Sequence, residues 1–429
     1  MKKVLSLVAL LLAALSAHAA DRVVVTVTND SGLARPAETI TVPFIQIVQL
    51  LDPAHANRQM WVTRNPAPKV RFDNLIVRDA AGKEIPNQVT NLDTKGGRNW
   101  IYDDLLFQHD FAAGEKSATF TVEAIDGTVP PYPSKVYARF APDRLDDFAW
   151  ENDLIAHRIY GPGLELPSAG PDLMPVGGSG VDVWSKRFSY FIIDRWYAKG
   201  HNPLHTETGE GLDMYETGQA RGDGGTGVWD GQAMHVSHDF RTQKLMANGP
   251  IRVEFELGYD AWDAGNGAKV SEVKRYIMDA GHYLDQVEST FTVTGADEVT
   301  VGIGLTEHTS RSDNAQVFPA SDDKNLWESV WETYRTNGQF GTGLVLAPDA
   351  KFAGFAKSQK NEPPSNGLRP DDLALVKVKN GDTVRFYAGA AWEFLGSIKT
   401  ADQWTAYLAN QAALLRAPVK VSVALEGAK

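Results

Sequence analysis

The chain has 429 residues and a formal net charge of −12, from 42 basic and 54 acidic residues. This acidic balance argues against nucleic acid or an anionic membrane surface as a partner. The sequence contains no cysteine, which excludes disulfides, thiolate metal sites and a cysteine nucleophile. Stability must therefore come from a hydrophobic core, and the length is sufficient for a large one.

The start of the chain has the pattern of a secretory leader. Lys2 and Lys3 precede an apolar run over residues 4–17, and residues 17–19 have the small-x-small form of a signal-peptidase site. We predict a signal peptide over residues 1–19 and a periplasmic or secreted mature protein. The apolar run is too short to cross a bilayer, and no later stretch approaches the required length, so we expect no membrane span.

Most of the remaining chain alternates apolar and polar residues with the period of a β-strand. The predicted strands cover residues 23–28, 70–78, 118–124, 135–140, 251–259, 299–305 and 419–425. Turn signals rich in glycine, asparagine and aspartate separate them. The pattern predicts an all-β protein, a large antiparallel β-sandwich with few short helices.

One segment near the C-terminal end has helical spacing instead. Thr400 and Gln403 form a capping box, and apolar residues then recur at positions 404, 408, 412 and 415 before Pro418. We expect a helix that covers an edge or end of a sheet.

We expect residues 20–429 to form a single large β-sandwich domain. The proline-rich run at residues 129–133 stiffens the backbone. It indicates an alternative division, with a distinct N-terminal β region over residues 20–133.

A polar segment over residues 200–218 is the strongest candidate for a functional site. It contains two histidines, four carboxylates and a tyrosine, namely His201, His205, Glu207, Glu210, Asp213, Glu216 and Tyr215. A histidine beside carboxylates is the usual pair for proton transfer near neutral pH. The alternative is a solvated loop whose polar side chains bond one another and water.

Aromatic and cationic residues flank this segment. Trp184, Lys186 and Arg187 lie upstream of it, followed by Tyr197. Rings that stack on the face of a sugar, together with charges that bind its hydroxyl and carboxylate groups, are typical of a sugar subsite.

A metal site in the same segment is a weaker alternative. His201 and His205 are four residues apart, with Glu207 and Glu210 behind them, but Pro203 argues against a helix that presents both histidines together. We assign no cofactor and no metal, although a divalent metal stays open.

Arg158 lies in a second polar block, over residues 150–161, which we expect to form one strand. Its guanidinium would pair either with Glu151 or Asp153 or with the carboxylate of a substrate. The internal ion pair is the more common outcome for such a residue.

His308 follows a predicted strand whose one face carries Gly302 and Gly304. Glycines on a strand leave room for something to lie against the sheet. His308 is either a structural histidine or a residue at the edge of that space.

These motifs resemble a family of exported bacterial proteins defined by a domain of unknown function. The resemblance rests on residues 150–161, 182–187, 196–197, 205–215 and 386–392, and it covers nearly all of the mature chain. It implies an association with the use of pectin and other uronate-containing polysaccharides, and a fold similar to the galactose-mutarotase-like β-supersandwich. Glu207 stands where an aspartate is expected, and Arg221 lies in a turn that is usually less charged. The resemblance implies no established reaction.

We predict an exported carbohydrate-active enzyme that acts on uronate-containing oligosaccharides by β-elimination. This reaction needs a cation on the sugar carboxylate, a base for the C5 proton and an acid for the leaving oxygen. The predicted catalytic residues are Arg187 with Lys186 for the carboxylate, His205 as base, Tyr215 as acid, and Glu210 or Asp213 to orient His205. The predicted substrate-binding residues are Lys186, Trp184, Tyr197, Arg158, His308 and Glu207.

Other classes stay open. A glycoside hydrolase would use Glu210 with Glu207 or Asp213 as paired carboxyl groups, and a sugar mutarotase or isomerase would use His205 or His308 as base. A non-catalytic glycan-binding protein would bind an oligosaccharide with the same rings and cations. The sequence does not predict the sugar, the linkage or the oligomeric state.

Overall fold

A computed structural model of the protein describes residues 21–56, 67–91, 102–166, 178–308, 314–358 and 369–427. The predicted signal peptide, residues 1–19, lies outside these ranges. Among the described residues, every pair of neighbouring strands runs antiparallel. The predicted all-β sandwich with few short helices is confirmed.

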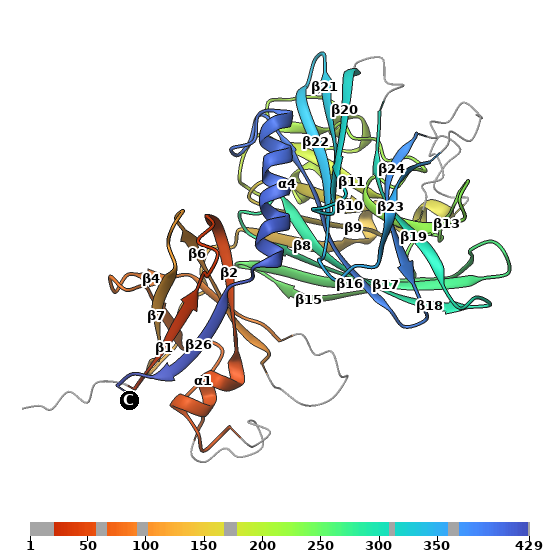
Figure 1. Ribbon diagram of the computed structural model, residues 1–429. Helices are drawn as coiled ribbons and strands as arrows, with labels where there is room; N and C mark the ends of the chain where they lie inside the picture. The colour runs from red at the N-terminus through yellow and green to blue at the C-terminus, as the bar shows by residue number, and fades with distance from the viewer. Residues whose placement is uncertain are drawn as a thin grey trace, which may run out of the picture.

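The N-terminal part of the chain forms a small β region with a hydrophobic core of its own (Figure 1). Val23, Val25 and Val27 alternate along its first strand and are completely buried in that core, as period-two alternation predicts. Helix α1 (Phe44–Leu51) packs against the same core. One sheet has the order β26 (Lys420–Leu425), β1 (Arg22–Thr28), β7 (Ser117–Ala124), β3 (Leu75–Arg78) and β4 (Glu84–Ile85); the other has the order β2 (Arg35–Pro43), β6 (Asp104–Phe111) and β5 (Asn87–Val89).

The larger part of the chain is a sandwich of one eight-stranded sheet and two five-stranded sheets that share one core. The eight-stranded sheet has the order β15 (Thr242–Asn248), β16 (Arg252–Asp263), β17 (Lys269–Asp279), β18 (Leu284–Thr294), β25 (Thr383–Trp392), β22 (Gly338–Leu346), β21 (Trp327–Tyr334) and β20 (Asn314–Asp322). One five-stranded sheet has the order β12 (Gly211–Asp213), β11 (Val181–Lys186), β10 (Ala156–Ile159), β9 (Asp147–Asn152) and β8 (Val136–Ala141). The other has the order β14 (Met234–His235), β13 (Asp223–Trp229), β19 (Val299–Thr306), β24 (Asp371–Val378) and β23 (Phe352–Lys357).

Period-two alternation explains how the central strands build this core. On β16, the predicted inward face is buried at Val253, Phe255, Leu257 and Tyr259. The predicted single strand over 150–161 is wrong, because the block forms β9 and β10 with a turn between them. Asn152 causes the turn, since its side-chain oxygen accepts hydrogen bonds from the backbone N–H groups of residues 154 and 155.

Helix α4 (Ala401–Arg416) confirms the predicted helix. Thr400 caps it, because its hydroxyl oxygen accepts from the Gln403 backbone N–H at 3.3 Å. Its buried face lies on the β21–β22 end of the eight-stranded sheet, where Gly341 leaves room for Trp404. The chain then leaves α4 and forms β26 beside β1, back in the N-terminal β region (Figure 1).

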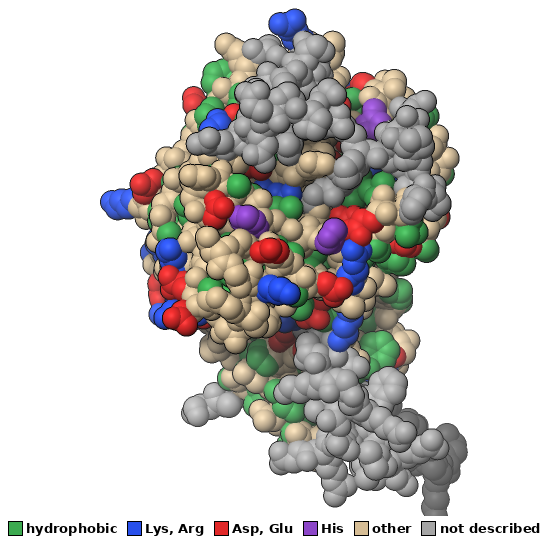
Figure 2. Space-filling model, turned by 90° about the vertical axis from the view of Figure 1, so that its right-hand side faces the viewer, with side chains coloured by type: hydrophobic (Ala, Val, Ile, Leu, Met, Phe, Trp, Pro, Cys, Tyr) green, Lys and Arg blue, Asp and Glu red, His purple; other side chains and the backbone are tan. Residues whose placement is uncertain are grey.

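Two short helices, α2 (Ile193–Tyr197) and α3 (His201–Leu204), follow β11, and short 3-10 turns occur at Pro142–Arg144 and Pro162–Glu165. Within the part of the chain that the structure describes, no helix combines the length and the apolar composition that a bilayer crossing needs. Figure 2 shows acidic and basic side chains interspersed over the face it draws, so the net negative charge does not form a field of one sign there.

Candidate functional site

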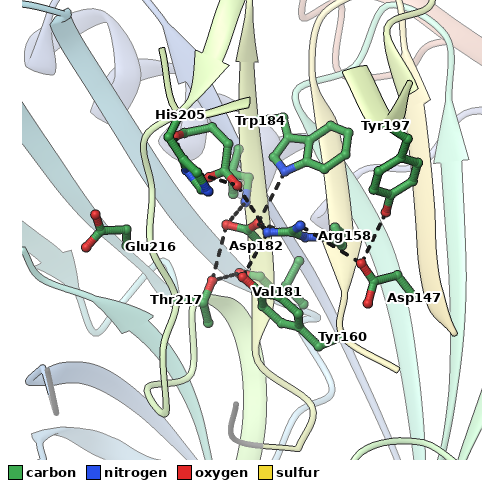
Figure 3. Close-up of polar contacts among 12 residues, drawn as sticks. Asp147, Arg158, Tyr160, Val181, Asp182, Trp184, Tyr197, His205, Glu216 and Thr217 are labelled. Atoms are coloured by element: carbon green, nitrogen blue, oxygen red, sulfur yellow. Dashed lines mark hydrogen bonds and ion pairs between the residues drawn. The ribbon is translucent and has the colours of Figure 1, made fainter. Parts of the chain in front are cut away.

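The five-stranded sheet β8–β12 carries charged side chains on its outer face. Side chains alternate along each strand: one face of β9–β12 joins the main core, and the other holds Asp147, Arg158, Asp182 and Asp213. The register brings them together, because Arg158 lies opposite Asp182, and Trp184 lies opposite Asp213. We call Asp147, Arg158, Asp182 and Asp213 the acid cluster. Figure 3 labels Asp147, Arg158 and Asp182.

Gly211 sets the register that delivers Asp213 to the acid cluster. Its φ is +115°, and a Cβ atom at this position would lie 2.0 Å from the Ser185 carbonyl oxygen. Only glycine tolerates both conditions. Because Gly211 pairs with Lys186, Asp213 falls opposite Trp184.

Arg158 is the buried centre of the acid cluster. Its Nε donates to Asp182 at 3.1 Å, and its Nη2 donates to Asp182 and, at 3.1 Å, to Asp213. Its Nη1 lies 3.9 Å from Asp147, and Nη2 also donates to the Tyr160 hydroxyl at 2.8 Å. One guanidinium therefore serves three carboxyl groups.

Three buried carboxyl groups around one cation favour the retention of a proton. Burial, helped by the charge of Asp182 and opposed by Arg158, raises the pKa of Asp213 to about 7. Burial also raises the pKa of Asp147 to about 6, although Arg158 lowers it. The pKa values of Asp213 and Asp147 thus lie close to neutral pH, the range in which general acid–base catalysis operates.

His205 connects the acid cluster to the surface. Its Nδ1 lies 3.0 Å from the backbone carbonyl oxygen of Asp213 and 3.7 Å from the carboxylate of the same residue. A carbonyl oxygen only accepts, so Nδ1 carries the proton and Nε2 is the basic nitrogen of the neutral ring. The His205 side chain is 36% exposed and that of Asp213 is 1% exposed. His205 is therefore open to solvent, and the buried Asp213 carboxyl lies behind it.

Glu216 lies beside the acid cluster (Figure 3). Its φ of +46° is unusual for a residue with a side chain, and such strained residues are concentrated at functional sites. Its negative charge helps to raise the pKa of Asp213, and Arg369 pairs with it at 2.6 Å. Figure 3 shows Glu216 on the side of the acid cluster opposite Tyr197.

Aromatic rings enclose the guanidinium. Arg158 lies over the rings of Tyr160 and Trp184, at 4.4 and 5.2 Å from their centres. The Trp184 indole N–H donates to Asp182 at 3.2 Å, and the Tyr197 hydroxyl donates to Asp147 at 3.4 Å. These rings exclude water from the charges, which strengthens each interaction inside the acid cluster.

Several predicted substrate contacts are structural instead. Trp184 is completely buried and stacks on Trp196, so it cannot stack on a sugar. Lys186 is also buried and donates to Glu151 at 2.8 Å, which makes it unsuitable for a substrate carboxylate. Arg158 forms the internal ion pair that was the first alternative, but its partners are those of the acid cluster.

The carboxylates Glu207 and Glu210 form surface ion pairs. Glu207 pairs with Arg187 at 2.9 Å. Glu210 accepts hydrogen bonds from Lys199, Tyr190 and Arg195, and these bonds lower its pKa to about 2. Glu210 is committed to these donors, and of the two candidates for orienting His205 it is Asp213 that lies against the imidazole.

Tyr215 and His308 lie in the interior, with ring centres 4.6 Å apart. Both are almost completely buried, and His308 Nδ1 lies 2.9 Å from Glu332. A buried tyrosine whose pKa is raised well above its usual range by burial is poorly placed to protonate a leaving group. Both residues therefore have structural roles here.

Among the described side chains, no group of three or more histidine and acidic residues is arranged to hold a metal ion. The side chain of His201, one of the ligands considered above, lies outside the described residues.

Sequence reasoning missed Asp147 and Asp182 as members of the site. Asp182 precedes Trp184 by two residues, so period-two alternation places both on one face of β11. Alternation therefore predicts that Asp182 and Trp184 share a face, but it does not predict that the strand carrying Arg158 pairs beside them.

The sequence matches a known protein family. The family model described as "Domain of unknown function (DUF4861)" matches residues 27–421. The chain belongs to the DUF4861 family. The DUF4861 protein is also 32% identical over 361 residues to "Uncharacterized protein P7" of Formosa agariphila, covering 82% of this chain and 85% of that relative.

Two solved structures are similar in part of their length. One is an alpha-mannosidase from Enterococcus faecalis V583, with a TM-score of 0.48 and 10% identity, covering 94% of this chain and 46% of the mannosidase chain. The other is a protein of glycosyl hydrolase family 38 from Enterococcus faecalis, with a TM-score of 0.47 and 10% identity, covering 94% of this chain and 47% of that one. The DUF4861 protein thus spans less than half the length of each structure.

Proposed function

We propose that the DUF4861 protein is an exported carbohydrate-active enzyme that cleaves uronate-containing oligosaccharides by β-elimination, with His205 as the base. The observation that supports this proposal most is the position of His205: partly exposed, bonded to Asp213, and backed by a carboxyl group whose pKa is raised to about 7.

Elimination can proceed with a single exposed base, and His205 is partly exposed. His205 takes the C5 proton, the C5 electron pair forms the C4=C5 double bond, and the C4–O bond breaks. The leaving oxygen receives the proton that His205 has gained, so one residue acts as base and then as acid. In its ionised form, the Asp213 carboxylate, 3.7 Å from Nδ1, stabilises the imidazolium between the two steps.

The cation on the sugar carboxylate is assigned to Arg187. Its side chain is 27% exposed, whereas Lys186 is buried. A uronate would compete with Glu207 for this guanidinium, and a guanidinium binds either carboxylate through paired hydrogen bonds.

Hydrolysis is a second candidate because burial raises the pKa of Asp213 to about 7 and that of Asp147 to about 6. Paired-carboxyl hydrolysis requires both groups to reach the glycosidic bond. The two side chains are almost completely buried, which favours elimination at His205.

The test is to incubate the purified protein with polygalacturonate oligosaccharides and to measure ultraviolet absorbance and reducing ends together. Elimination increases both signals, because each cleavage also creates a conjugated double bond. Reducing ends alone would replace elimination by hydrolysis, and silence in both signals would contradict the proposal.

The matched variants are His205→Ala and His235→Ala. His235 is 30% exposed and bonded to Asp230 at 2.9 Å, outside the acid cluster. We expect His205→Ala to reduce turnover by at least a hundredfold and His235→Ala to leave it unchanged. Equal effects of the two substitutions would rule out His205 as the base.

A further inference from the structure

Two aromatic rings face solvent in the bend that follows β11. Phe188 and Tyr190 are 47% and 43% exposed. Their ring centres are 5.3 Å apart and their planes differ by only 10°. We call Phe188 and Tyr190 the aromatic platform. Large apolar side chains that are exposed together and parallel mark a recognition surface more often than a single exposed ring does.

A buried ion pair fixes the bend that carries the aromatic platform. Lys186 donates to the Tyr190 carbonyl oxygen at 3.2 Å as well as to Glu151. The Glu151 carboxylate accepts the backbone N–H groups of Ile192 and Ile193 at 2.8 and 2.9 Å. A completely buried salt bridge that binds the backbone at Tyr190 and at the two residues 192 and 193 holds this end of the bend in one conformation. A ligand would therefore not have to order the bend when it binds.

The ring of Tyr190 is also held at its outer end. Its hydroxyl donates to Glu210 at 2.7 Å, and Glu210 is itself bound by Arg195 and Lys199. The Arg195 guanidinium lies 5.4 Å from the centre of the Tyr190 ring. Tyr190 is thus held at both its backbone and its hydroxyl, and the Phe188 ring stacks on it.

Two cationic side chains lie beside the aromatic platform. The Arg195 guanidinium faces the Tyr190 ring, and Arg195 and Lys199 both pair with Glu210, the residue that accepts the hydrogen bond of the Tyr190 hydroxyl. The carboxylate of an anionic sugar would compete with Glu210 for these two cations, because both form charge-assisted hydrogen bonds to carboxylates.

From these observations we infer that the aromatic platform is a second sugar subsite, which binds one ring of an anionic polysaccharide by stacking while the neighbouring cations bind its carboxylates. Flat aromatic surfaces bind the apolar face of a sugar ring, and rigid rings do so at a low entropic cost. This inference rests on the proposed function and extends it from short oligosaccharides to longer chains.

The position of the platform agrees with this role. Phe188 follows Arg187, which pairs at 2.9 Å with Glu207, and Glu207 is two residues after His205. Consecutive Cα atoms are 3.8 Å apart, so the Cα atoms of Glu207 and His205 are at most about 8 Å apart. One oligosaccharide can span such a distance. The platform would therefore hold a chain whose next residues extend toward His205.

The experiment measures binding in a protein that cannot consume its ligand. In the His205→Ala background, Phe188→Ala with Tyr190→Ala is compared with Phe318→Ala, which removes an equally exposed ring (45%) from β20, an edge strand of the eight-stranded sheet. Migration is measured in native gels that contain polygalacturonate or the neutral polymer galactan. Melting temperatures of the variants confirm that each one is folded.

We expect polygalacturonate to retard the His205→Ala protein and its Phe318→Ala variant equally. The affinity of the double platform variant for polygalacturonate should be at least tenfold weaker than that of the His205→Ala protein. Galactan should retard none of them. Unchanged affinity of the double platform variant, or equal retardation by galactan, would overturn the inference. The proposed function is tested separately by turnover: loss of platform binding with no turnover in the unaltered protein would retain the subsite and reject elimination.

Discussion

Replacing Arg158 by methionine tests how the acid cluster is held together. Methionine keeps much of the volume and removes the charge, so three buried carboxyl groups lose their common partner. Removing one member of a buried ion pair typically costs about 3–5 kcal/mol, because an uncompensated charge remains. The total stability of a domain is of the order of 5–15 kcal/mol, so the loss should be large.

The matched control is Arg195→Met. Arg195 also pairs with a carboxylate, Glu210, but its side chain is 59% exposed. Water screens such a pair, and its loss should cost no more than about 1 kcal/mol.

The assay is urea unfolding of both variants at pH 5 and pH 8, followed by fluorescence of the buried tryptophans. The defect of Arg158→Met should be larger at pH 8, because the carboxyl groups of the acid cluster can take up protons at pH 5 and lose their charge. Equal defects in Arg158→Met and Arg195→Met, or a defect independent of pH, would refute this account of the cluster.

Three further predictions concern pH, packing and helix capping. Burial raises the pKa of Asp213 from 3.8 to about 7 in the folded protein. Its contribution to the free energy of unfolding is therefore fully present below about pH 4 and is lost as the pH rises to 7. Asp213→Asn does not titrate, so its melting temperature should fall less between these pH values than that of the unaltered protein. Gly341→Ala should destabilise the protein by about 1–3 kcal/mol in urea unfolding, because the new Cβ would lie 2.3 Å from the ring of Trp331; wild-type stability would contradict this packing. Thr400→Ala should cost about 1 kcal/mol through the lost cap, whereas Thr400→Ser keeps the hydroxyl acceptor and should melt like the wild type.

Local patterns predicted much of the fold. The alternation on β16 and the capping box at Thr400 depend on residues close together in sequence, and both are found in the structure. The turn between β9 and β10 was missed because it depends on the side chain of Asn152, which also donates to the backbone oxygens of Asp279 and His282. Such distant partners leave no trace in a local pattern.

Predictions for the candidate site also succeeded for residues close together in sequence and failed where distant segments decide the surroundings. His205 and Asp213 are close in sequence and are in contact, as their shared segment suggested. Trp184 and Lys186 were assigned to the substrate because alternation gives the face of a strand but not what covers that face. Here the chain after β11, including Ile193 and Trp196, packs over the outer face and buries them.

The pairing of β26 with β1 has a consequence for the order in which the protein assembles. Val23 lies opposite Leu425, so this contact closes a loop of nearly the entire described chain. Contacts of such separation form late, since the entropy of closure is lost before the pairing is gained. Until then one edge of β1 carries unpaired N–H and C=O groups, which are a template for association with other chains. We expect the larger sandwich and α4 to form first, and a partly assembled molecule to be most prone to aggregate at the exposed edge of β1.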